Sequence, residues 1–499
     1  MEMQIRSHLL ATATALLLVF HVASSAAALS LNLNGTPFAD EAVAVERAST
    51  HAVEGRVRTG VSLGELYPLM FEVHSLRVSY EGGEIRLGSS KDIADLFGHV
   101  LYRDGRSWSL HTDSRTLEEV ESIAVEGLPL DVEELTVWLS WEGTDIIEGE
   151  IDRFARLFGI DVQSSTIPDT GSKLGATERA RGEPADVVLI QSSFVPDLRK
   201  LEALQPLGPA EQEDPPTPAQ AAFTVDGSVW ARSLYFDSHL VFYNPQILEE
   251  TPAEGWTLRD LERIAASARS HVEVPLTWNA YSAYWLTPFV LGYGKDRIVS
   301  EDGRVHVDDE PTRRAVTRIL EMVEDGALTV MERDAMTAYF TSGRAAIILT
   351  GSYSIPSFEK LGIPFDVAPF PHIAETGEPV RPFLDFKGFA VSRRARHPVL
   401  ARRFIEYMTS PAVQARITLP IRKMPAEEQA WPLVADEHPY AEALMKSYQI
   451  GVPVPNRRGY TVYKSLMWRM LRFVFDGRME VRPMLERSDR MIEEAMKGG

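Results

Sequence analysis

The stretch LTVWLSWEGTDIIEGEIDRFARLFGIDVQSS (135–165) decides the fold. It opens with a nearly continuous apolar run over 135–141, which is typical of a buried parallel strand. Apolar residues then recur at helical spacing over 146–159, and a glycine closes that segment. Short apolar runs at 160–165 and 185–193 predict two more buried strands. This alternation of strand and helix predicts an open α/β sheet.

Ligands of such sheets sit beyond the carboxyl ends of the strands. The segments at those ends here are Ser140-Trp141-Glu142 and Gln191-Ser192-Ser193. Further along the chain, Asp226-Gly227 predicts a hairpin that leads into another strand. Thr257 is expected to cap a helix with Asp260 three residues on, and residues 311–326 predict an amphipathic helix.

The composition bounds the class of protein. The chain has 499 residues, enough for two to four domains, and 44% of them are hydrophobic. Its 51 Lys and Arg against 71 Asp and Glu give a net charge of −20, which disfavours binding to nucleic acid or anionic membranes. The absence of cysteine excludes disulfides, thiol chemistry and a cysteine-linked lipid anchor.

The N-terminal residues predict export. Residues 1–28 contain Arg6, an apolar run over 9–22 and small residues up to Ala28, in the order of a secretory signal peptide. The alternative is a membrane anchor, but the apolar run is shorter than the ~20 residues that a spanning helix needs. We therefore expect a periplasmic protein whose signal peptide is cleaved and which carries no lipid anchor.

Residues 29–132 are expected to form a separate small α+β domain. Hairpins are predicted at Gly82-Gly83 and at Asp104-Gly105, with a short helix over 91–100. No motif in this segment indicates a chemical role.

Enzyme signatures are missing from the whole sequence. There is no H-E-x-x-H, G-x-S-x-G or phosphate-loop motif, and the twelve histidines are scattered singly. We therefore predict no catalytic residue, no metal site and no cofactor. Residues 387–423 hold nine Lys or Arg and a single acidic residue, which indicates either a solvated face or a docking surface.

Polar and aromatic residues cluster in the second half of the chain, for example in WNAYSAYW (278–285) and GSYS (351–354). A sugar presents apolar C–H faces and many hydroxyl groups, so its site needs flat rings together with carboxylates or amides. These segments fit that need, although core packing is an alternative explanation for each aromatic residue taken singly.

Six segments in order carry a family resemblance over about 135–496. Together they resemble the extracellular solute-binding proteins of ABC importers, the large family that includes maltodextrin-binding protein. The segments are LTVWLSWEG (135–143), PADVVLIQSS (184–193), SLYFDSHLVFYNPQILEE (233–250), EGWTLRDLERIA (254–265), AYFTSGRAAIILTGSY (338–353) and KGFAVSRRARHPVLARRFIEYMTSPAVQ (387–414).

The resemblance implies a periplasmic-binding-protein-like α/β clamp of two lobes, joined by hinge-crossing segments and closing on a ligand. The first lobe would combine residues 133–236 with 388–436, and the second 237–387 with 437–499. It implies a non-enzymatic, monomeric receptor that captures a sugar or oligosaccharide and delivers it to the membrane permease subunits of an ABC importer.

The resemblance also implies ligand-binding residues. Family positions that contact sugar hydroxyls or stack on sugar rings correspond to Glu142 beside Trp141, to Asp237, Tyr284, Trp285 and Tyr353, and to a residue near Tyr463. Asp385 stands at an expected second crossing, and Gln191 is expected to hydrogen-bond a sugar at the point where the sequence departs from the family. One departure concerns the segment 190–194, Ile-Gln-Ser-Ser-Phe, where maltodextrin-binding protein has a Trp and an Asp-Arg pair. The solute is therefore expected to be a sugar or another polyhydroxylated compound that need not be maltodextrin.

Two other functions stay open. One is a ligand-sensing or interaction module that uses residues 29–132 to contact a partner. The other is a secreted glycoside hydrolase, which would need two carboxylates flanking the sugar.

Overall fold

The computed structural model describes residues 29–33, 36–39, 44–45, 47–67, 71–87, 96–112, 115–129, 134–210 and 216–497. The expected signal peptide at 1–28 and the first half of the helix expected at 91–100 lie outside these residues. The described second half of that segment is not helical, because residues 96–98 form a turn and Val100 begins a strand. The chain divides into two compact units, one formed by residues 1–50 and 58–129 and the other by 51–57 and 130–499.

The described part of the first unit consists largely of two five-stranded sheets that share one apolar core, to which Val61, Leu76, Leu110 and Ile123 contribute. One sheet contains β1 (Ser30–Leu33), β2 (Thr36–Ala39), β5 (Phe71–Tyr80), β6 (Gly83–Leu87) and β10 (Ser122–Pro129). The other contains β3 (Ser49–Val53), β4 (Arg56–Ser62), β7 (Val100–Asp104), β8 (Ser107–Thr112) and β9 (Arg115–Leu117), and α3 (Leu63–Leu66) is a short helix. The β5–β6 and β7–β8 pairs confirm both expected hairpins.

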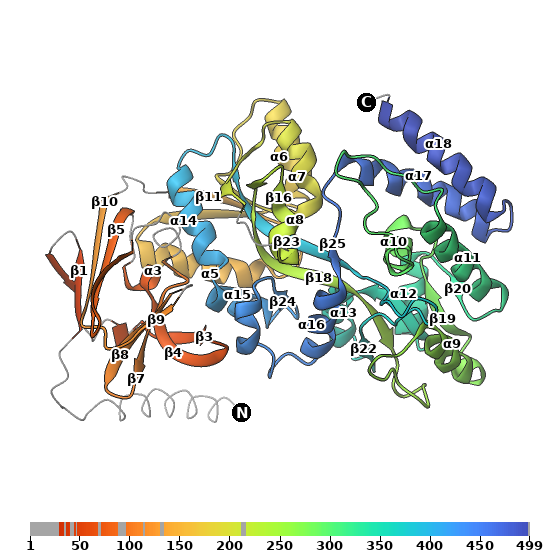
Figure 1. Ribbon diagram of the computed structural model, residues 1–499, viewed down its shortest axis with the longest axis horizontal. Helices are drawn as coiled ribbons and strands as arrows, with labels where there is room; N and C mark the ends of the chain where they lie inside the picture. The colour runs from red at the N-terminus through yellow and green to blue at the C-terminus, as the bar shows by residue number, and fades with distance from the viewer. Residues whose placement is uncertain are drawn as a thin grey trace. The chain divides into compact units, whose positions relative to one another are not determined.

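The second unit begins with strands and helices in alternation, as the opening stretch predicts (Figure 1). These elements are β11 (Glu134–Leu139), α5 (Thr144–Phe158), β12 (Asp161–Thr166), α6 (Thr170–Arg179), β13 (Val187–Gln191), η1 (Ser192–Phe194), α7 (Val195–Lys200), β14 (Leu204–Gln205), β15 (Gly208–Pro209), α8 (Pro218–Phe223), β16 (Thr224–Val225) and β17 (Ser228–Val229). β11 pairs in parallel with β12 and with β13. We call the part built on β12, β11, β13 and β23 the first lobe.

Helix α5 shows why this stretch is decisive. It ends where Gly159 adopts the left-handed conformation at φ 66°, which glycine reaches without a steric penalty. Its apolar face buries Phe154 against Phe404 and Tyr407, with ring centroids 5.2 and 5.3 Å away. The hairpin at Asp226-Gly227 is also confirmed.

The expectation that residues 160–165 form a buried strand is wrong in part. They do form the strand β12, but it is the end strand of its sheet, and its side chains are exposed or half-buried. An edge strand has one neighbour and tolerates polar side chains, so the run Gln163-Ser164-Ser165 is compatible with its position.

The second lobe is built on β21, β19 and β20. Its elements are α9 (Leu258–Ser267), η2 (Ala268–Ser270), β19 (Val274–Trp278), α10 (Ala283–Gly292), α11 (Glu310–Glu324), β20 (Thr329–Val330), α12 (Arg333–Thr341), β21 (Ala345–Gly351), η3 (Ser352–Ser354), α13 (Ile355–Lys360) and β22 (Asp366–Ala368). The expected cap of α9 is confirmed, because the Thr257 hydroxyl accepts from the Asp260 amide and the Asp260 carboxylate accepts from the Thr257 amide.

The chain returns to the first lobe and then supplies the C-terminal helices. These elements are β23 (Phe383–Ser392), α14 (Pro398–Met408), α15 (Pro411–Thr418), β24 (Met424–Pro425), η4 (Glu428–Leu433), α16 (Ala441–Ile450), β25 (Val452–Pro453), α17 (Arg458–Phe475) and α18 (Val481–Lys497). α17 packs along α18 and against α10 (Figure 1). The residue limits of the two lobes stay a prediction, since residues 130–499 form one compact unit.

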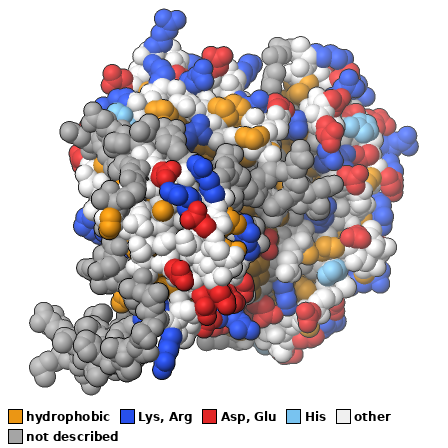
Figure 2. All heavy atoms as spheres, turned by 60° about the vertical axis from the view of Figure 1, so that its left-hand side comes forward, with side chains coloured by type: hydrophobic (Ala, Val, Ile, Leu, Met, Phe, Trp, Pro, Cys, Tyr) orange, Lys and Arg blue, Asp and Glu red, His pale blue; other side chains and the backbone are white. Residues whose placement is uncertain are grey.

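Surface charge of both signs is mixed on the face drawn in Figure 2, and the hydrophobic side chains there are scattered rather than gathered into one patch. Among the described residues, no helix has the length and apolar character that a membrane span requires.

Candidate binding site

Strand β18 (Arg232–Tyr243) connects the two lobes. Its residues 232–238 pair with β23 and its residues 239–243 pair with β21, so the strand changes partners between Ser238 and His239. Almost every side chain of β18 is buried, and Asp237 lies one residue before Ser238, the last residue that pairs with β23. The chain thereby places a carboxylate at the junction between the lobes.

Asp237 is held by two lysines. Its Oδ2 accepts from Lys387 Nζ at 2.9 Å and its Oδ1 from Lys423 Nζ at 2.6 Å, while the Ser352 hydroxyl donates to Oδ1 at 2.8 Å. Burial disfavours the charged carboxylate, but the two ammonium groups outweigh this and hold the pKa of Asp237 well below its usual range. Ser352 follows β21, so this bond ties the second lobe to the crossing strand.

A second carboxylate completes the group. Lys387 Nζ also donates to Asp385 Oδ2 at 3.1 Å, and Gln191 Nε2 lies 2.7 Å from both carboxylate oxygens of Asp385. We call Asp237, Asp385, Lys387 and Lys423 the Asp237 cluster. Its two positive and two negative charges balance, and the side chains are at most 13% exposed.

Trp141 and Glu142 are the site residues expected directly after β11. Glu142 lies at the edge of the Asp237 cluster, and Trp141 precedes it in the chain. Glu142 Oε2 is 3.9 Å from Lys423 Nζ, and its side chain is 43% exposed. Trp141 is half-buried and has φ 69°, a left-handed conformation that a bulky residue adopts only with strain of about 1–3 kcal/mol. The sharp turn at Trp141 and Gly143 connects β11 to α5.

The aromatic pair Tyr284-Trp285 lies on α10 and packs on the second half of β18. Trp285 stacks on the buried imidazole of His239 with ring centroids 4.0 Å apart, and Tyr284 meets the same ring edge-on at 4.5 Å. Burial lowers the pKa of His239 to about 3, so the imidazole is neutral. Trp285 is buried, whereas Tyr284 is half-buried.

Tyr353 follows β21 and is half-buried. Its ring lies over Gly351, where an added Cβ would come within 2.2 Å of a ring carbon. Glycine at this position is therefore required for the observed ring orientation.

Tyr463 is placed differently from the expectation that it stacks on a sugar. It is fully buried, and its hydroxyl lies 3.2 Å from the hydroxyl of Thr287 on α10. Because the side chain is fully buried, no ring face is available to a solute in this conformation. On the same helix, the ring of Trp468 is exposed.

The structure thus brings Gln191, Asp237 and Asp385 into one hydrogen-bonded network, with Glu142 beside it. Tyr353 is linked to it through its neighbour Ser352. Sequence reasoning missed Lys423 as a site residue, although it noted the basic segment that contains it. The available signal was the pair Arg422-Lys423 between the apolar Ile421 and Met424.

Most of the basic segment 387–423 is paired internally. Its side chains bind carboxylates or backbone carbonyls, in the contacts Lys387–Asp237, Arg394–Glu178, Arg396–Glu134, Arg402–Leu207, Arg403–Glu406, Arg416–Glu150, Arg422–Glu359 and Lys423–Asp237. Arg393 instead lines a cavity of about 460 Å³ in the first lobe.

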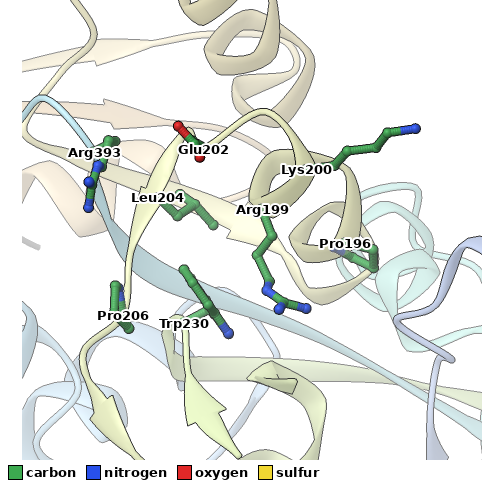
Figure 3. A pocket seen from close by; sticks show the side chains of 8 residues that line it. All are labelled: Pro196, Arg199, Lys200, Glu202, Leu204, Pro206, Trp230 and Arg393. Carbon is green, nitrogen blue, oxygen red and sulfur yellow. The ribbon is translucent and has the colours of Figure 1, made fainter. Parts of the chain in front are cut away.

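That cavity lies apart from the expected site. Figure 3 shows Trp230 next to Arg199 on its wall, with Arg393 at the other side of the view. The Arg199 guanidinium lies 4.9 Å from the Trp230 ring centroid and pairs with Asp226 at 2.7 Å. The residues lining it include no expected ligand-binding residue. A second cavity of about 270 Å³ is lined from both lobes, Arg199 and Arg457 among its residues.

Residues 151–430, more than half of the chain, match the family model of bacterial extracellular solute-binding proteins. The chain belongs to this family. It is a family of substrate-binding proteins rather than of enzymes. A relative of this solute-binding protein, the maltodextrin-binding protein MdxE of Bacillus subtilis (strain 168), is 23% identical over 290 residues, covering 55% of this chain and 69% of the relative.

Solved structures share the fold of this solute-binding protein. A cyclo/maltodextrin-binding protein complexed with maltotetraose aligns with a TM-score of 0.65 at 19% identity, covering 73% of this chain and 98% of that one. The maltose-binding periplasmic protein MalE of Listeria monocytogenes, in complex with maltose, aligns at 0.64 and 18% identity, covering 74% and 99%. These likenesses confirm the expected two-lobe α/β clamp.

Proposed function

We propose that this solute-binding protein captures a neutral sugar or oligosaccharide between its two lobes and delivers it to the membrane subunits of an ABC importer. The observation that carries the proposal is the charge balance of the Asp237 cluster at the strand that joins the lobes. The relatives whose names state maltodextrin, maltose or maltotriose as ligand support the same class of solute.

The charge balance of the cluster limits the net charge of the solute. A charged ligand in a buried site needs an opposite charge that no other protein group already neutralises. An amino acid or a sugar acid would need a free ammonium or guanidinium group for its carboxylate. Lys387 and Lys423 already share the carboxylates of Asp237 and Asp385, which leaves no free cation within the cluster. A hydroxyl group both donates and accepts, so it can bind to such a mixed surface without adding charge.

The partly exposed rings supply the other half of a sugar site. Tyr284 and Tyr353 are each half-buried, on α10 and after β21. Aromatic faces pack on the apolar C–H faces of a pyranose ring. Carboxylate and amide groups from the first lobe and rings from the second would therefore contact one solute from two sides, and such shared contacts favour the closed form.

The same geometry disfavours hydrolysis. A glycosidase needs one carboxylic acid that keeps its proton near neutral pH and a second carboxylate opposite to it. The two lysines hold the pKa of Asp237 well below its usual range, so Asp237 stays ionised and has no proton to donate. We therefore propose a receptor without catalytic activity.

The proposed location follows from residues 1–28, whose sequence has the pattern of a secretory signal peptide. The mature chain would act in the periplasm, without a lipid anchor because it has no cysteine. The proposed residue limits of the lobes are those given above, and residues 29–132 would form an additional domain.

Thermal unfolding of the purified mature protein against a solute panel tests the proposal. A ligand at 100 times its Kd should stabilise the protein by about 2.7 kcal/mol. We expect neutral mono- or oligosaccharides to raise the melting temperature, and sugar acids and amino acids to leave it unchanged. Stabilisation by charged solutes alone, or by no sugar, would contradict the proposal.

A further inference from the structure

The cavity of about 460 Å³ in the first lobe lies at the edge of the sheet opposite to Gln191. β23 runs antiparallel to β13, and Gln191, at the carboxyl end of β13, pairs with Lys387. Arg393 lines the cavity and follows β23, six residues after Lys387 and at the amino end of β13. Six residues of extended strand span about 20 Å, so the cavity is separate from the residues at the junction between the lobes.

Trp230 forms a firmly held part of the cavity wall. Its amide donates to the Phe223 carbonyl oxygen at 3.0 Å, and its Nε1 donates to the Val225 carbonyl oxygen at 3.3 Å. The Arg199 guanidinium lies 4.9 Å from the ring centroid, and its Nη2 donates to Asp226 Oδ2 at 2.7 Å. The wall is therefore ordered before any ligand arrives, which lowers the entropic cost of binding.

Arg393 supplies a free positive charge on the other side of the cavity. In the view of Figure 3, Trp230 lies between Arg393 and Arg199. The backbone of Arg393 is fixed, since its amide donates to the Ala203 carbonyl oxygen at 2.8 Å. The other eight Lys and Arg side chains of residues 387–423 bind carboxylates or backbone carbonyls. The Arg393 side chain makes no ion pair or hydrogen bond with any residue that the structure describes.

The polar side chains of the lining offer more hydrogen-bond donors than acceptors. The Lys200 side chain has no ion-pair or hydrogen-bond partner in the described part of the chain, and the buried Nε of Arg199 has no acceptor there. Lysine and arginine donate but cannot accept, and Glu202 is the acidic residue among the described lining residues. Even with Asp226 counted against Arg199, the three cations exceed the carboxylates by one charge, on a chain of net charge −20. A complementary ligand brings acceptor atoms and a negative charge.

The rest of the lining is apolar. The buried Leu204, the Trp230 ring, Pro196 and Pro206 supply this surface. A bare inorganic anion would leave it in contact with water, whereas a carbon skeleton would cover it. The volume of the cavity is in the range of small-molecule sites. The lining therefore fits an organic anion with an apolar body.

We propose that this cavity binds a small organic carboxylate, whose oxygen atoms accept from Arg393 and Arg199 and whose apolar body packs on Trp230. The site is separate from the junction between the lobes, so it does not depend on the proposed function. Ordinary solvation of surface cations would explain Arg393 and Lys200. It would not explain a buried donor of Arg199 that lacks an acceptor in an ordered wall.

Isothermal titration of the purified protein with 2-naphthoate tests the site, with neutral 2-naphthamide and inorganic phosphate as comparison probes. We expect 2-naphthoate to bind and both comparison probes to bind about tenfold more weakly or not at all, because one lacks the charge and the other the apolar body. Arg393→Gln should raise the Kd of 2-naphthoate about tenfold. Arg393→Lys should recover part of this loss, because lysine keeps the charge but not the planar fork.

Arg394→Gln is the matched control, since Arg394 is the next residue in the chain but pairs with Glu178 and does not line the cavity. It should leave the Kd of 2-naphthoate unchanged, and all variants should unfold at the same temperature. No binding of 2-naphthoate, equal affinity for 2-naphthamide or phosphate, or an unchanged Kd in Arg393→Gln would overturn the carboxylate site. A failure to bind any sugar would instead overturn the proposed function and leave this site standing.

Discussion

Replacing Asp237 by asparagine should destabilise the second unit strongly. The change leaves the Lys387 ammonium with Asp385 alone and the buried Lys423 ammonium with only the partly exposed Glu142 carboxylate, 3.9 Å away, and it brings an amide N–H against a lysine. Removing one partner of a buried ion pair costs about 3–5 kcal/mol, because the remaining charge stays desolvated. We expect Asp237→Asn to lose this much of the free energy of unfolding at pH 7.

The acid dependence supplies a second signature. The pKa of Asp237 is lowered in the folded state, so its stabilising contribution is complete above the unfolded pKa of about 3.9 and is lost as the pH falls below it. The gap in stability between the unmodified protein and Asp237→Asn should therefore be constant from pH 7 to about pH 4 and narrow below that.

Denaturant unfolding followed by tryptophan fluorescence measures these values. Eight of the nine tryptophans, all except Trp108, belong to residues 130–499, so the signal reports on the second unit. Glu486→Gln is the matched control, because it removes an exposed i,i+4 ion pair that contributes only about 0.3–0.5 kcal/mol.

A double variant separates the charge argument from a general packing defect. In Asp237→Asn/Lys423→Met, one positive and one negative charge are removed together and the Lys387–Asp385 pair remains balanced. We expect it to recover much of the loss, since a buried pair replaced by neutral groups is often close to neutral in stability. The reasoning is refuted if Asp237→Asn is as stable as the unmodified protein, or if adding Lys423→Met only increases the damage.

Three further outcomes are expected. Gly351→Ala should push the ring of Tyr353 aside, because an added Cβ would lie 2.2 Å from a ring carbon. The loss of ring stacking should raise the Kd for sugar about tenfold. An unchanged Kd in calorimetry would contradict this. Trp285→Ala should lower the free energy of unfolding by about 3–5 kcal/mol, since it opens a cavity beside His239; a loss below 1 kcal/mol in denaturant unfolding would argue against that packing. The Kd for a neutral sugar should stay constant from pH 5 to about pH 9, because the pKa of Asp237 is lowered and that of Lys387 is raised, both away from this range. A change in the measured Kd between pH 6 and about pH 7 would show that another titratable group controls binding.

The caps and ends of individual helices could be predicted from the sequence, because the residues that determine them lie close together in the chain. The end of α5 at Gly159 and the cap of α9 by Thr257 and Asp260 each depend on residues within a few positions of one another. The edge position of β12 was not predictable in this way, since an apolar or polar run does not say how many neighbours a strand has.

The candidate site divides along the same line. Asp237 was found from its place in the crossing strand, but its pairing with Lys423 joins residues 186 positions apart in the chain. For Tyr463, the sequence predicted a ring that contacts the solute, whereas the structure buries this ring completely. Trp468, about one turn further along α17, is exposed. The helical period places residues on a face, yet what covers that face depends on the neighbouring helix.

The sequence by itself determined the order of strands and helices, the family resemblance and the acidic, cysteine-free character of the chain, because period, turn chemistry and composition can be read from the residues alone. Only the tertiary structure decided that two lysines neutralise Asp237, that Tyr463 is part of the core and that Trp468 on the same helix is exposed. The physical reason is that ladder register and helix packing, set by the whole chain, choose the partner of each buried group.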